Sequence, residues 1–200
     1  MYAFYQIFEL FVEIVIKIGI MMFNKNSVIK PNPYGKLSLD KLEEFEKEIG
    51  VKLPDEYRKY LIQYNGAKFE NNTFSLNWDK GNKSTIHSMY GIANKPKWFS
   101  IREQNPYLYD INVVKKGYLS IGSDGLGNQI LIKLKWPNKG AIYFWDHEKP
   151  FLRFKNVLLK QADSFIEFVD NLKKEETYEE FMKRMSVENP VMYKRLKELE

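Results

Sequence analysis

The sequence predicts an α+β domain, in which helices pack on a mainly antiparallel sheet of about five to six strands. Two amphipathic helical patterns occupy residues 38–66, and short alternating patterns separated by turn residues follow between residues 74 and 159. A further helical pattern begins near Asp163. Because tight turns join antiparallel neighbours, consecutive short strands of this kind favour antiparallel pairing.

The first helical pattern begins at Ser38, a typical N-cap residue, and ends at Gly50, a typical helix stop. Its apolar residues recur at spacings of three, three and four and are predicted to face inward: Leu39, Leu42, Phe45 and Ile49.

The second helical pattern, residues 53–66, has both ends marked. Pro54 and the two acids after it suit a first turn, where a missing N–H costs little and negative charge meets the positive helix end. Asn65-Gly66 is typical of a left-handed helix stop. One face of the helix is predicted to pack on a core through Tyr57, Tyr60, Leu61 and Tyr64.

Six runs downstream are predicted as strands: residues 74–76, 86–90, 118–121, 129–135, 141–145 and 157–159. Residues 137–140 are predicted as a hairpin turn, and the stretch around Pro96 and Pro106 as a loop with one ragged helical turn. The helix after Asp163 is predicted to bury Phe165, Ile166, Phe168, Val169 and Leu172. A capping box at residues 177–180 and the pair Asn189-Pro190 predict two more short helices.

Composition limits the class of protein. Two hundred residues, 44% of them hydrophobic, suffice for one ordinary domain. The chain has no cysteine, so it offers neither a disulfide framework nor a thiolate zinc site, and we expect a cytoplasmic protein. The net charge of +5 comes from interspersed charges of both signs, whereas nucleic-acid binding favours a clustered basic stripe.

Residues 1–23 are strongly apolar, yet Gln6, Glu9, Glu13 and Lys17 trace one polar line down a helix. Three charges in so short a stretch disfavour a membrane span, and a signal peptide would need a positive start and a cleavage site. We expect an amphipathic helix laid on the domain or on a partner. The alternative is an over-extended start of the reading frame, because Met21 and Met22 offer a normal-looking beginning.

Asp146-His147-Glu148, together with Asp124, is the most tempting set for metal binding or acid–base catalysis. Adjacent residues at a strand end point in different directions, and His87 lies in another strand. We therefore favour a structural interpretation, in which the acids bond turn backbone and His147 bonds locally.

Other catalytic and binding motifs find little support. The glycines of residues 122–127 precede a strand instead of a helix and lack the Gly-Lys-Ser/Thr ending of a P-loop, so a tight inter-strand loop is favoured. No serine of the sequence lies in a Gly-x-Ser-x-Gly elbow, the motif that presents a serine nucleophile. Aromatics interleaved with lysines, as in residues 133–136, are an alternative platform for single-stranded nucleic acid, but hairpin packing is favoured. We expect no catalytic residue, cofactor, metal or nucleic-acid partner.

Three segments in fixed order carry a family resemblance. They are LPDEYRKYLIQYNG at residues 53–66, IGSDGLGNQILI at 121–132 and GAIYFWDHE at 140–148, followed by a helix containing SFIEF at 164–168. The pattern resembles the SMI1/KNR4, or SUKH, superfamily. The matching positions, expected to be structural, are Leu53, Pro54, Tyr57, Tyr64, Asn65, Gly66, Gly127, Asn128 and Trp145.

The resemblance implies a curved sheet and a SUKH domain over residues 36–173. The charged sequence that follows predicts a helical tail over 174–200. It also implies a bacterial immunity protein that binds a cognate toxin domain, commonly a nuclease, and blocks it stoichiometrically without catalysis. A regulatory or scaffold module of the fungal type is the alternative. An inhibitor that mimics nucleic acid is usually acidic, so either the acidic groups of this net positive chain gather on one face or the toxin is not a basic nuclease. For the first alternative, Asp124, Asp146 and Glu148 at the strand ends are predicted to form the toxin-binding face. The sequence leaves the oligomeric state open.

Overall fold

The protein is described here by a computed structural model. It describes residues 29–30, 35–76, 83–92, 99–110, 117–149 and 157–198, with the side chains of residues 29–30 and 106–110 excepted. The apolar segment 1–23 lies outside the described residues.

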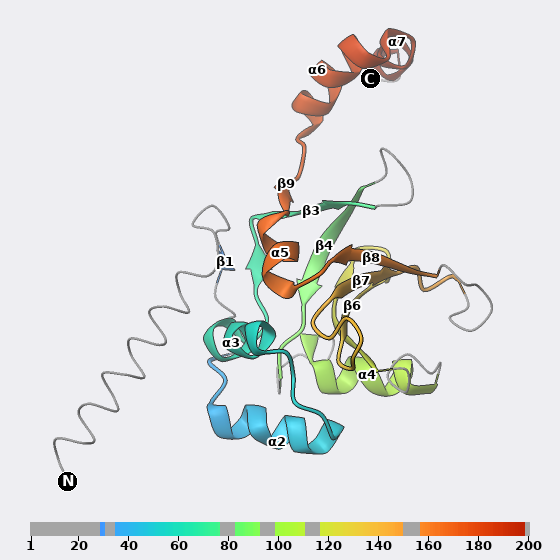
Figure 1. The fold of residues 1–200 in the computed structure, drawn as a ribbon. Helices are drawn as coiled ribbons and strands as arrows, with labels where there is room; N and C mark the ends of the chain where they lie inside the picture. The colour runs from blue at the N-terminus through green and yellow to red at the C-terminus, as the bar shows by residue number, and fades with distance from the viewer. Residues whose placement is uncertain are drawn as a thin grey trace, which may run out of the picture.

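A seven-stranded antiparallel sheet forms the centre of the domain, in the order β8-β7-β6-β5-β4-β3-β9, and it curls into an open half-barrel (Figure 1). The strands are β3 (Asn71–Ser75), β4 (Lys83–Met89), β5 (Tyr118–Asp124), β6 (Gln129–Lys133), β7 (Ile142–Trp145), β8 (Leu158–Ala162) and β9 (Lys173–Lys174). A separate pair joins β1 (Ile29–Lys30) to β2 (Lys68–Phe69).

The predicted α+β class with a curved antiparallel sheet is confirmed, and all six predicted strands are present. The seventh strand of the sheet, β9, was not predicted. Both of its residues are exposed, and two residues are too few to show the alternation that identifies a strand.

Helices α2 (Leu39–Ile49) and α3 (Asp55–Tyr64) form as predicted. The Ser38 hydroxyl accepts a hydrogen bond from the Lys41 N–H, and Gly50 and Asn65 end the two helices in left-handed conformations. The prediction was wrong for Leu39, the first residue of α2, which is 49% exposed.

Helix α4 (Ile101–Asp110) replaces the loop predicted around Pro106. Proline inside a helix removes a hydrogen bond, so the local pattern argued against a helix. Tertiary contacts hold it nevertheless: Ile101 is fully buried, and the Asn105 amide bonds both backbone groups of Ser120, at 2.9 and 3.0 Å. Asn105 thus bonds the backbone of β5 at Ser120, beyond the residues of β5 that pair with β4.

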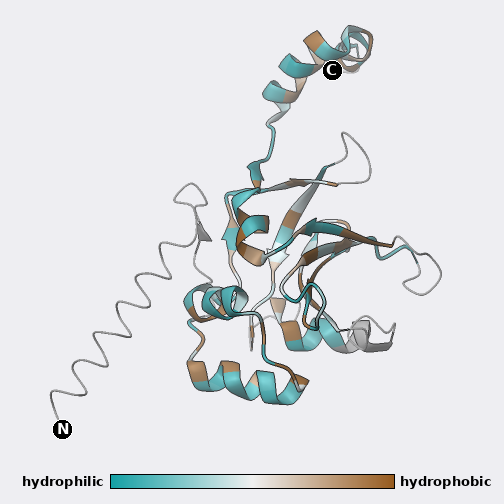
Figure 2. Ribbon diagram, in the orientation of Figure 1, coloured by the Kyte–Doolittle hydropathy of each residue, from teal (hydrophilic) through white to brown (hydrophobic). Residues whose placement is uncertain are grey.

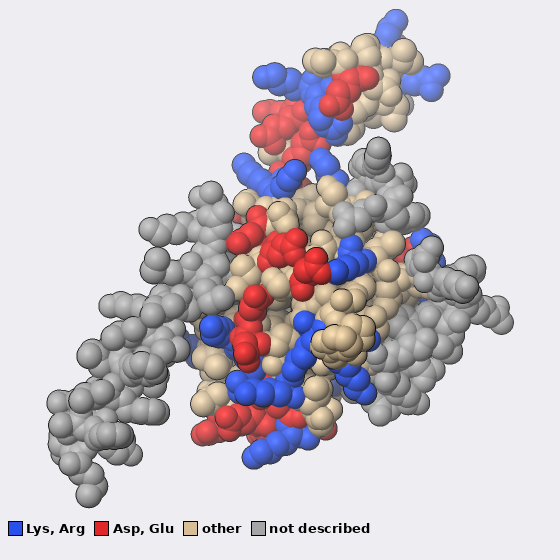
Figure 3. All heavy atoms as spheres, in the orientation of Figure 1, with Lys and Arg blue, Asp and Glu red and all other residues tan. Residues whose placement is uncertain are grey.

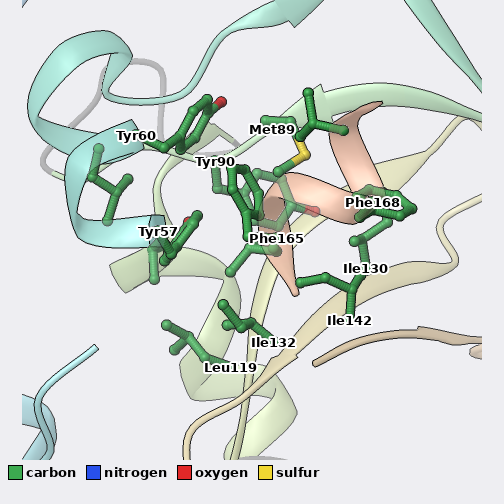
Figure 4. Close-up of a cluster of buried hydrophobic side chains, with 14 of the residues drawn as sticks. Tyr57, Tyr60, Met89, Tyr90, Leu119, Ile130, Ile132, Ile142, Phe165 and Phe168 are labelled. Carbon is green, nitrogen blue, oxygen red and sulfur yellow. The ribbon is translucent and has the colours of Figure 1, made fainter. Parts of the chain in front are cut away.

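The core lies between the sheet and helix α5 (Phe165–Asp170), with α3 packed against α5 (Figure 4). Phe165 contacts both buried tyrosines of α3, with ring centroids 5.0 Å from Tyr57 and 4.8 Å from Tyr60. Phe168 packs edge-on against Phe74 of β3, at 5.4 Å. In Figure 2 apolar residues appear on the central strands and on α5, whereas β3 and α2 are mostly polar.

The C-terminal helices α6 (Tyr178–Glu188) and α7 (Pro190–Lys197) follow β9 and stand away from the sheet (Figure 1). Thr177 and Glu180 form the predicted capping box, and Asn189 caps α7. The division into a SUKH domain over 36–173 and a tail over 174–200 stays a prediction.

Replacing Phe165 with alanine removes the ring that joins α3 to the sheet. We expect Phe165→Ala to lower the free energy of unfolding by about 3–5 kcal/mol, the usual cost of truncating a buried aromatic residue. The matched control, Leu39→Ala, removes an exposed side chain and should change it by less than about 0.5 kcal/mol. Urea denaturation measures both, and similar losses in the two variants would contradict the assignment of the core.

Burial raises the pKa of the Tyr57 hydroxyl well above its usual range, and that of Tyr60 likewise. A raised folded-state pKa means that the folded protein favours the neutral hydroxyl. The free energy of unfolding is therefore undiminished below the unfolded pKa of about 10. It falls as the pH rises above that value, by up to about 1.4 kcal/mol per pH unit for each tyrosine.

The Tyr57 hydroxyl has no hydrogen-bond partner among the residues that the structure describes. We therefore expect Tyr57→Phe to keep or raise the melting temperature at pH 7 and to unfold less readily than wild type above pH 10. Thermal denaturation at pH 7, 10 and 11 measures both effects. A loss of stability at pH 7 would show that the hydroxyl is bonded.

Candidate functional site

Two connections lie side by side at one end of strands β5, β6 and β7, and we call them the loop site: residues 124–128 and residues 146–149. The pairing of Gln129 with Trp145 brings them together. Asn128 joins them, because its side-chain oxygen accepts from the His147 N–H at 3.2 Å and lies 3.0 Å from His147 Nδ1. Since that oxygen only accepts, Nδ1 carries the proton.

Asp124 braces the loop site from within. The residue is 6% exposed, and its carboxylate accepts from four donors: the backbone N–H groups of Leu126 and Asn128 at 2.9 Å, the Asn128 amide at 2.8 Å and the Ser84 hydroxyl at 3.0 Å. Gly127 adopts a φ of +94°, which favours glycine. The predicted tight loop with an aspartate bonding its backbone is confirmed.

Asp146 and Glu148 lie in the neighbouring turn. Asp146 accepts from the Glu148 N–H at 3.1 Å and pairs with Lys149 Nζ at 3.1 Å, whereas the Glu148 side chain is exposed. The structure therefore brings all three predicted acids to one end of the sheet, but it turns Asp124 inward. The exposed apolar residue there, Leu126 at 80% exposure, was not singled out by the sequence.

The matching family positions of α3 are structural. Leu53 and Tyr57 are buried and Tyr64 is half-buried. The Asn65 side chain accepts from the Ile92 N–H at 2.8 Å and donates to the Gly35 carbonyl at 3.2 Å, so it joins three distant segments. A Cβ at Gly66 would lie 2.7 Å from the Gly91 nitrogen, which explains glycine there.

Trp145 is buried on the outer face of the sheet, packed with Leu131 and Val157, and its indole N–H donates to the Lys149 carbonyl at 3.2 Å. Beside this cluster, Tyr118 and Tyr143 meet edge-on, with ring centroids 5.3 Å apart. Two aromatics that cover each other offer a poor stacking platform for nucleic-acid bases.

A hollow of about 420 Å³ lies between β2, β4 and the loop site, and its titratable lining residues are Lys68, His87 and Glu175. Within the described ranges, no group of three or more histidine, aspartate or glutamate residues is placed to hold a metal ion. His147 and His87 belong to different surroundings, His147 bonded to Asn128 and His87 lining this hollow.

Exposed acidic residues gather on another surface, over α5 and the adjoining end of α3 (Figure 3). Glu56, Asp163, Glu167 and Asp170 contribute, the last three exposed. Two of them also cap backbone: Glu56 accepts from the Ile166 N–H at 3.1 Å, and Glu167 from the Asp163 N–H at 2.7 Å. A net positive chain therefore carries a locally acidic surface, which the sequence did not place.

The SMI1 / KNR4 family (SUKH-1) profile matches residues 36–171, more than half of the chain. The chain belongs to this family. It is also similar to the SPbeta prophage-derived uncharacterized protein YokK of Bacillus subtilis (strain 168), with 28% identity over 153 residues, covering 66% of this chain and 73% of that protein. Among the described helices, none is long and apolar enough to cross a membrane.

The four hydrogen bonds to Asp124 predict unequal roles for the acids of the loop site. We expect Asp124→Ala to lower the free energy of unfolding by about 2–4 kcal/mol, because it leaves buried donors without an acceptor. Glu148→Ala, the matched control, should leave stability within about 0.5 kcal/mol of wild type. Differential scanning calorimetry compares the two, and equal melting temperatures would refute the bracing role.

Proposed function

We propose that this protein is an immunity protein, which binds a cognate toxin domain and blocks its active site by stoichiometric protein–protein contact. Membership of the SMI1/KNR4 family carries the proposal, because immunity proteins are common in that family. The protein acts without catalysis and in the cytoplasm of the toxin-producing cell, where it meets newly made or incoming toxin.

The chemistry of the loop site agrees with a binding role. Its polar groups, Asp124, Asn128 and His147, are engaged with one another and with backbone. A hydrolase needs a nucleophile held beside a free general base. The bonded groups of the loop site suit the shaping of a surface better than proton transfer. A binding module needs a rigid scaffold with exposed loops, which this sheet provides.

A nuclease is the class of toxin that the acidic surface favours. Nucleases carry basic clefts that attract phosphates, and an acidic surface competes for such a cleft through complementary charge. Figure 3 shows negative charge gathered over α3 and α5, although the whole chain is net positive.

Co-expression tests the proposal. Where a large secreted protein is encoded beside this gene, its C-terminal domain is produced in a bacterial host, with and without this chain, and surviving colonies are counted. We expect survival to recover when this chain is present, and recovery should be specific to that toxin domain. Unchanged killing would reject the immunity role, and a host protein recovered instead in a defined complex would favour the regulatory module.

The sequence predicts toxin contact at the loop site, and this stays a prediction. Asp146 and Glu148 carry it, because charge reversal at Asp124 would also disturb the fold. Under that prediction, Asp146→Lys combined with Glu148→Lys would weaken toxin binding while the melting temperature stays near that of wild type. Equal binding by this variant in biolayer interferometry would remove the loop site from the interface.

A further inference from the structure

Trp136 is the most exposed large apolar side chain of the described residues, at 88%. It lies in the hairpin between β6 and β7, which is firmly held: the Gly140 N–H donates to the Lys133 carbonyl at 2.8 Å, and the Ala141 N–H to the Asn138 carbonyl at 3.0 Å. Asn138 and Gly140 adopt φ values of +66° and +96°. A rigid turn thus presents an indole ring to solvent.

An exposed tryptophan adds little to folding, because its apolar surface stays in water. At protein interfaces the same residue contributes more than most others, since it buries a large area and loses few rotamers on binding. Trp136 therefore has the properties of a binding anchor. Leu126, at the opposite end of β6, is similarly exposed at 80% but far smaller.

The hairpin lies beside acidic residues of two other parts of the chain. A Cβ at Gly140 would lie 3.6 Å from the Pro54 side chain, so the hairpin reaches the first turn of α3 with Asp55 and Glu56. Ile142 pairs with Ala162, which places the hairpin and Asp163 at the same end of β7 and β8. We call this surface the hairpin end: residues 135–139, Pro54 to Glu56, and Asp163.

Two carboxylates of the hairpin end, those of Glu56 and Asp163, belong to the acidic surface over α3 and α5 (Figure 3). Asp55 and Asp163 are exposed, with Asp163 paired to Lys160. Lys135 and Lys139 lie on the turn itself and are also exposed. An apolar anchor bordered by charges of both signs, with the acids continuing over two helices, fits a basic protein surface with an apolar pocket.

We infer that the hairpin end is the anchor surface for the toxin domain, with Trp136 seated in an apolar pocket that basic side chains border. This inference rests on the proposed immunity function. The acids of α3 and α5 then face the basic rim of the toxin cleft, and the loop site at the other end of β6 lies outside the anchor.

The same observations disfavour single-stranded nucleic acid as the occupant. A strand of nucleic acid needs successive stacking platforms and positive charge along its phosphates. Trp136 is one aromatic ring, and the carboxylates of Asp55, Glu56 and Asp163 offset the positive charge of Lys135 and Lys139 beside it.

Trp136→Ala and Leu126→Ala form a matched pair for the test. Both remove an exposed apolar side chain from a turn next to β6, so both variants should keep the melting temperature of wild type. With the purified toxin C-terminal domain as probe, we expect Trp136→Ala to raise the dissociation constant at least about thirtyfold, as loss of an interface hot spot does. Leu126→Ala should change it less than about threefold.

A second pair tests the charges. Asp55→Asn with Asp163→Asn should slow association with the toxin domain and reduce its dependence on salt, whereas Asp146→Asn with Glu148→Gln should leave both unchanged. Biolayer interferometry at 50 and 300 mM NaCl measures the association rate at each salt concentration. A labelled oligothymidine serves as the nucleic-acid probe. The inference would be overturned if the wild-type chain bound this probe and Trp136→Ala did not.

The failures are distinguishable. Normal binding by Trp136→Ala, or loss confined to Leu126→Ala and the loop-site acids, would overturn the hairpin end as anchor while the immunity function stands. Failure of the wild-type chain both to bind the toxin domain and to protect cells would overturn the function and the anchor together.

Discussion

The aromatic contact between α3 and α5 is the interaction on which the other surfaces depend. Helix α5 has six residues, too few to be stable alone, and its position comes from Phe165 packed against Tyr57 and Tyr60. Glu56 adds a bond from α3 to the first turn of α5. Because α5 also follows β8 directly, this contact fixes the orientation of the acidic surface relative to the sheet and the β6–β7 hairpin.

Strand β6 supports a connection at each end, and the two ends use their polar groups differently. At the loop site, the Asp124 carboxylate is occupied by four donors, so its charge organises the loop and is withdrawn from solvent. At the hairpin end, backbone bonds and left-handed residues hold the turn, and the side chains of residues 135–139 are exposed. A carboxylate whose hydrogen bonds stabilise the fold contributes little to binding, because bonding it to a partner instead would leave its buried donors without an acceptor.

Sequence alone predicted the elements whose ends are marked locally, such as α3 between Pro54 and Asn65, and the hairpin that precedes Gly140. It missed α4, because the contact of Asn105 with Ser120 joins segments that are distant in sequence. The same limit applied to the candidate site. The sequence did not show how deeply the loop encloses Asp124. It also did not show that Trp136, for which hairpin packing was favoured, stays exposed. Local patterns predict which residues share a face of an element, but not what that face meets.

Net charge is a poor guide to the partner of this protein for a related reason. Charges in salt solution act over about 8–10 Å, so an approaching surface responds to the groups in its own neighbourhood and only weakly to the total of +5. The fold gathers carboxylates over α3 and α5, and basic side chains border them on the same face (Figure 3). A partner of opposite charge is therefore selected by where α5 lies, and α5 lies where Phe165 meets the tyrosines of α3.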